Sequence, residues 1–89
     1  MNYLTKIMIM IGGRLWSAPL IDALAAIPPD LAFPDEKIAV HNAIQGVHAI
    51  PGLLRGWFVK PVDAANDEMQ LAEVVAALVA GIEKYLPPA

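Results

Sequence analysis

The feature that most constrains the fold is a long apolar helical pattern near the C-terminal end of the chain. The pattern covers residues 63–86, with Asp63 as the helix cap and Pro87 as the stop. Within it, the nine residues from Val74 to Ile82 carry no polar side chain. Because a helix that is apolar on every side belongs inside a protein, we expect other elements to enclose this segment.

Small residues mark one side of the same helix. Ala72, Ala76 and Ala80 recur every four residues, so they share a face. Small side chains allow another helix to approach closely. The stripe is therefore a candidate contact surface.

Two further helices are predicted upstream. The first covers residues 17–27, with Ser17 as its N-cap and Pro19 in its first turn. The second covers residues 35–50 and stops at Pro51. Its spacing predicts a core-facing side made of Val40, Ala43, Ile44, Val47 and Ile50.

Two short apolar runs, residues 4–11 and 53–59, fit a buried strand as well as a helix. The second run is rich in aromatic and β-branched residues, which favours a strand. We therefore expect a short two-stranded β element beside about three helices. The predicted fold class is mainly α, with α+β as the alternative, in a single small domain over residues 1–89.

The composition predicts a surface that is short of polar groups. Hydrophobic residues make up 57% of the chain and charged residues 17%, against roughly 25% charged in an ordinary domain. A domain of this size buries only about 60–65% of the surface that its unfolded chain exposes. Apolar groups are therefore left outside, and a contiguous patch of them normally marks a contact with other protein.

Charge and hydropathy exclude two other classes of partner. The net charge is −3, which argues against nucleic acid even though arginine and aromatic residues occur together near Trp16 and Trp57. Charged residues interrupt every apolar run, so we expect no membrane-spanning helix. A signal peptide is not expected either, because only Lys6 precedes the short apolar run at the N-terminus.

The most site-like pattern is His41, Gln45 and His48, which share one face of the predicted helix 35–50. Two histidines seven residues apart on a helix are separated by about 10 Å, too far to bind one metal ion. The favoured interpretation is a polar stripe. A small enzyme or ligand-binding module that uses His41 and His48 is the alternative.

No other pattern indicates catalysis or a cofactor. The carboxylate pairs Asp35-Glu36 and Asp67-Glu68 lie near predicted helix N-termini, where the helix dipole favours acidic residues. The turn Gly12-Gly13 lacks the spacing of a phosphate-binding loop. The chain has no cysteine, which excludes thiolate chemistry. We expect no catalytic residue, cofactor or metal.

These features predict a non-enzymatic interaction or structural subunit. It would assemble through apolar surface into a homo-oligomer or a larger complex, such as a virus particle. An inhibitor or adaptor that docks on one host protein is an alternative. Tryptophan and arginine are enriched at binding hot spots, so the expected interface residues are Trp16, Arg55, Trp57, Phe58, Ala72, Ala76 and Ala80. The expected partner is protein, with a small molecule disfavoured.

Overall fold

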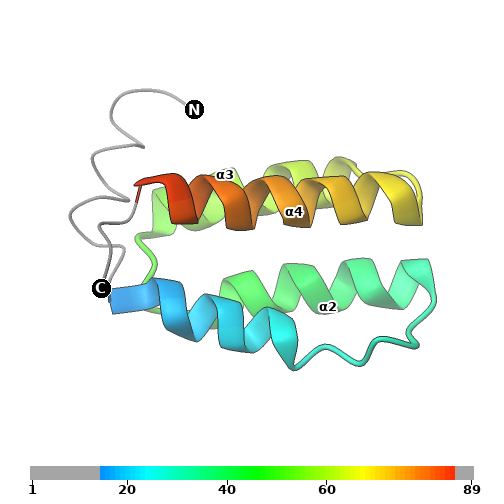
Figure 1. Cartoon of the computed structure of the whole chain (residues 1–89), viewed down its shortest axis with the longest axis horizontal. Coiled ribbons are helices and arrows are strands. Elements are labelled where there is room, and N and C mark those ends of the chain that lie inside the picture. Colours follow the sequence, from blue (N-terminus) through cyan, green and yellow to red (C-terminus); the bar gives the residue numbers. More distant parts are fainter. Residues whose placement is uncertain (1–14, 86–89) are drawn as a thin grey trace.

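The chain forms an antiparallel bundle of helices. The computed structural model describes residues 15–85, in which a helical segment over 15–25 is followed by α2 (Phe33–Gly46), α3 (Gly52–Ala64) and α4 (Glu68–Tyr85). Consecutive helices run in opposite directions along the long axis of the molecule (Figure 1). The mainly α prediction is confirmed, and the described residues contain no strand.

All four helical stretches contribute to one core. The side chains of Trp16 and Phe58 meet inside it with ring centroids 5.6 Å apart and a tilt of 58°, a favourable arrangement for an aromatic pair. The other large buried side chains come from all four helical stretches and from the turn after α2. They include Leu20, Ile44, Ile50, Leu54, Val62, Leu71 and Ile82.

The strand prediction for residues 53–59 is wrong, because this run lies within α3. Leu54, Phe58 and Val62 recur every fourth residue and are all buried, so a helix places them together on the core side. Burial of this face outweighs the weak β preference of its aromatic and branched residues. The partner run, residues 4–11, lies outside the described residues.

The helix predicted over residues 35–50 begins at Phe33 and ends earlier, at Gly46. Glycine is a poor helix former, and the residue before Pro51 is disfavoured from helical geometry. The chain turns after Gly46, and the Ile50 N–H donates to the carbonyl of Val47 at 3.1 Å. Val47 and Ile50 are nevertheless buried, as predicted, because the turn folds them onto the core.

The first predicted helix, 17–27, also shifts. Residues 15–25 are helical, so Ser17 and Pro19 lie inside the helix and Ser17 is not its N-cap. At the other end, the Ile27 N–H donates to the carbonyl of Leu24 in a closing turn, and Pro28-Pro29 prevents the helix from continuing.

The C-terminal helix starts five residues later than predicted, and its cap is Asp67 instead of Asp63. The Asp67 carboxylate accepts the Gln70 N–H at 2.8 Å, and the Gln70 side-chain oxygen accepts the Asn66 N–H at 2.8 Å. The first bond satisfies a backbone donor that the helix start leaves free, and the second ties the residue before the cap to the first turn of α4. Leu86, the predicted last residue, lies outside the described residues.

The apolar stretch of α4 is not enclosed on all sides, contrary to the prediction. Ile82 is buried and Val74, Val75 and Leu78 are half-buried, but the alanines of the stretch are exposed. The reason is that a bundle covers only one side of a peripheral helix. None of the helices in residues 15–85 is long and apolar enough to cross a membrane.

Candidate functional site

The first candidate surface lies on the outer side of α3. Leu53 and Trp57 stand one helical turn apart, with 61% and 46% of their surface exposed. Gly56, Trp57 and Lys60 line a shallow hollow of about 280 Å³ beside them. A β-carbon added to Gly56 would meet no atom within 4 Å, so the hollow is open. We call Leu53, Gly56, Trp57 and Lys60 the α3 face.

Lys60 gives this surface a polar edge. The α3 face thus combines two large apolar side chains with an exposed lysine. Aromatic and apolar anchors with a polar rim are typical of protein-binding surfaces.

The second candidate surface is an open groove of about 390 Å³, which we call the α4 groove. One wall is formed by Leu24, Ile27 and the two prolines that follow the helical segment 15–25. Glu36 and Val40 of α2 form a second wall. The third wall comes from α4 and consists of Ala72, Val75 and Ala76. Two members of the predicted alanine stripe therefore border the groove, whereas exposed Ala80 is not one of its lining residues.

Trp16 and Phe58, two of the predicted interface residues, lie in the core. Trp16 is fully buried and Phe58 is 6% exposed. On α3, Phe58 and Trp57 are neighbours in sequence but lie about 100° apart around the helix axis, so one faces the core and the other the solvent. Trp57 is the exposed tryptophan of the described chain.

Arg55, another predicted interface residue, is half-buried and reaches back toward α2. One Nη1–H donates to the carbonyl of Gln45 at 3.3 Å, in the last turn of α2. That turn contains no basic residue of its own, so Arg55 supplies the positive charge that the C-terminal end of a helix favours. Arg55 therefore joins α2 to α3.

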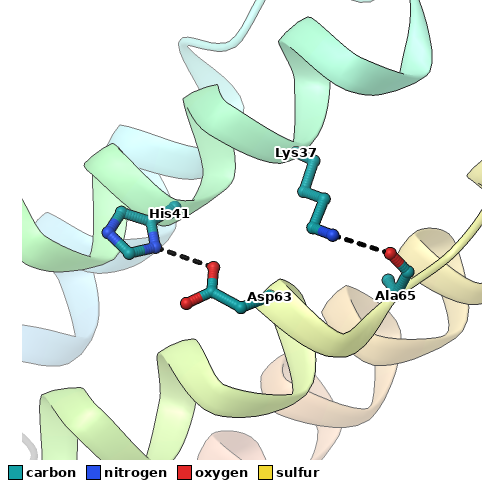
Figure 2. A network of polar contacts seen from close by, with 4 residues as sticks. All are labelled: Lys37, His41, Asp63 and Ala65. Carbon is teal, nitrogen blue, oxygen red and sulfur yellow. Dashed lines mark hydrogen bonds and ion pairs between the residues drawn. The ribbon is translucent and has the colours of Figure 1, made fainter.

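Polar contacts also join the middle of α2 to the end of α3 (Figure 2). The Lys37 amine donates to the carbonyl of Ala65 at 2.8 Å, and His41 Nδ1 lies 2.8 Å from Asp63 Oδ1. Lys37 and His41 are one turn apart, so both lie on the side of α2 that borders α3. The His41–Asp63 pair is partly open to solvent, with 36% and 52% of the two side chains exposed.

The predicted histidine stripe is not retained. His41 lies within α2, but His48 lies in the exposed turn after Gly46, so His41, Gln45 and His48 do not share one helix face. Neither histidine lines the α3 hollow or the α4 groove. The described residues contain no group of three or more histidines and carboxylates placed to hold a metal ion.

Sequence analysis missed Leu53, the Lys37–Ala65 contact and the upstream walls of the α4 groove. Leu53 becomes recognisable once the segment is read as a helix, because it precedes Trp57 by one turn. The groove has no local signal, since three separate elements form it. Comparison with family models, curated proteins and solved structures finds no match to this chain.

Proposed function

We propose that this protein is a non-enzymatic interaction or structural subunit that assembles through apolar surface, first of all with copies of itself. The single observation that supports this proposal best is the α3 face. Its Leu53 and Trp57 side chains lie one turn apart beside a hollow, with 61% and 46% of their surface exposed. Their removal from water on assembly contributes roughly 25 cal/mol for each Å² of apolar surface.

The α3 face also has the chemistry of a helix-mediated interface. Gly56 has no side chain, so a second helix can approach α3 closely beside Trp57. A symmetric pair of α3 helices would place the same residues on both sides of the contact, as in most homodimers. A particle subunit, as in a virus, is the larger form of the same proposal.

The test is the mass of the purified chain in solution, measured by light scattering and sedimentation over two decades of concentration. We expect the mass to rise with concentration and the Trp57→Lys variant to remain a monomer. Ile38→Lys is the matched control, because Ile38 is an apolar residue on α2 that is at least as exposed as Trp57, 59% against 46%, and lies outside the α3 face. It should assemble like the unchanged chain.

A monomer at every concentration would overturn self-assembly and favour the adaptor or inhibitor, which needs a different protein as its partner. Equal loss of assembly in Trp57→Lys and Ile38→Lys would place the contact elsewhere. Circular dichroism of each variant checks that the helical bundle is intact. An assembly that persists in Trp57→Lys would remove the α3 face from the proposal.

An enzyme or ligand-binding module that uses His41 with Asp63, in place of the predicted His41 and His48, is a second proposal because of one contact. A carboxylate that orients an imidazole is the arrangement expected of a general base, and His41 and Asp63 have this geometry. A double-mutant cycle with His41→Gln and Asp63→Asn tests it. A surface pair with a purely structural role should give a coupling of about 0.2–1 kcal/mol between the two substitutions in the free energy of unfolding. Neither substitution should then change the binding of a ligand.

A further inference from the structure

The α4 groove is a second surface with a chemistry of its own. Its walls are mainly apolar, and Ala72 and Ala76 stand one turn apart along α4. An amphipathic helix binds to such a groove by laying its apolar side against the walls. The small alanine side chains leave room for the backbone of such a helix to approach α4.

The groove carries an acidic charge. Glu36 is the charged residue among those that line it, and Asp30, Asp35 and Glu73 are exposed carboxylates next in sequence to lining residues. All nine carboxylates of the chain lie within residues 15–85, together with four lysines and arginines. An occupant that carries lysine or arginine beside its apolar side therefore matches this surface.

The cation nearest to the groove in sequence is already used elsewhere. Lys37 follows Glu36, but its amine donates to the carbonyl of Ala65 at the end of α3. Arg55 is likewise bonded to α2 at Gln45. Carboxylates outnumber lysines and arginines nine to six in a second copy of this chain, which argues for a different, more basic protein as the partner.

From this geometry we infer that the α4 groove binds a cationic amphipathic helix of another protein. The apolar side of that helix packs on Ala72, Ala76 and Leu24, and its lysines or arginines lie near Glu36. This inference does not require assembly through the α3 face, which lies on a different helix. If this protein is an adaptor, or a subunit of a complex with other proteins, the inference gives the chemical class of its partner.

The test uses a fluorescent 14-residue peptide of leucine and lysine, spaced so that all leucines share one side of a helix. The full-length chain is titrated into it and the anisotropy is measured. We expect saturable binding that weakens with salt, because exposed charges are screened. A peptide with glutamate in place of every lysine should not bind.

Variants of the chain locate the contact. Ala76→Arg places bulk and like charge in the wall, and we expect affinity to fall about tenfold or more. Glu36→Gln removes one partly exposed charge, and a loss of about two- to fivefold is expected. Ala77→Arg is the matched control, because Ala77 is exposed on α4 but does not line the groove. Its effect should be less than about threefold, the part due to net charge alone.

Three results would overturn the inference. The first is an equal loss in Ala76→Arg and Ala77→Arg, which would indicate attraction to the acidic chain as a whole. The second is equal binding of the glutamate peptide, which would make the groove a general apolar site. The third is tighter, Ala76-dependent binding of a peptide with the sequence of residues 1–14, which would assign the groove to the chain itself. The mass of the Trp57→Lys variant in solution shows separately whether the chain assembles through the α3 face.

Discussion

The buried indole of Trp16 leads to a quantitative prediction about stability. Its Nε1–H is buried and has no acceptor within hydrogen-bond distance among the described residues. An unpaired buried donor costs about 1–3 kcal/mol, because the group loses its bond to water and gains none in return. Trp16→Phe removes this donor while it keeps an aromatic ring against Phe58.

The opposing cost of Trp16→Phe follows from the volume that it removes. The side chain shrinks by about 40 Å³, which costs about 1 kcal/mol at roughly 24 cal/mol for each Å³ of cavity. The lost apolar area, about 40 Å², adds about 1 kcal/mol. The gain and the cost nearly cancel, so the free energy of unfolding should change by less than about 1 kcal/mol. Trp16→Ala leaves no aromatic ring in the core position and should lower the free energy of unfolding by about 3–5 kcal/mol.

The assay is urea unfolding followed by far-ultraviolet circular dichroism, which does not depend on the tryptophan that is replaced. All variants are compared at one protein concentration, so that assembly affects them equally. Ile38→Val, at an exposed position outside the α3 face, is the control and should stay within about 0.5 kcal/mol of the unchanged chain. A loss above about 2 kcal/mol in Trp16→Phe would refute the reasoning, because it would mean that the indole N–H has a partner in solution.

Three smaller changes test other contacts in the same assay. Lys37→Met keeps the apolar stem but removes the bond to the carbonyl of Ala65, so a loss of about 0.5–1.5 kcal/mol is expected; an unchanged midpoint would contradict a role for this bond. Asp67→Ala removes the cap of α4 and should cost about 1 kcal/mol, while Asp30→Ala, in the exposed loop, should cost less than about 0.5 kcal/mol. Gly56→Ala should add about 0.5–1 kcal/mol, since the helix offers open space there; a loss would show that the hollow is occupied.

Local sequence signals located most helix ends to within a few residues. Pro28-Pro29 and Pro51 mark the breaks before and after α2, because proline cannot supply the N–H that a continuing helix needs. Four of the five residues predicted to face the core from residues 35–50 are buried, including Val47 and Ile50 beyond the end of α2, whereas Ala43 is half-buried. Cap assignment was less secure. Asp63 and Asp67 both suit a helix start, and only the fold assigns Asp67 to the cap and Asp63 to His41.

The candidate surfaces depended more on tertiary structure than on sequence. Composition alone predicts that apolar groups remain exposed, because a small domain has too much surface for its interior. It does not say which groups these are. Trp16 and Trp57 look alike in sequence, yet one is fully buried and the other nearly half exposed.

The sequence itself therefore determined the excess of apolar residues, the mainly α class and the places where the helices end. These properties follow from side-chain chemistry and from local backbone geometry. Only the tertiary structure decided that residues 53–59 are helical, that Trp16 is buried and that three elements form the α4 groove. A short apolar run fits either a strand or a helix, and the choice depends on which neighbours bury it. Here the neighbours are other helices. Leu54 and Phe58, four residues apart on one side of α3, pack against them.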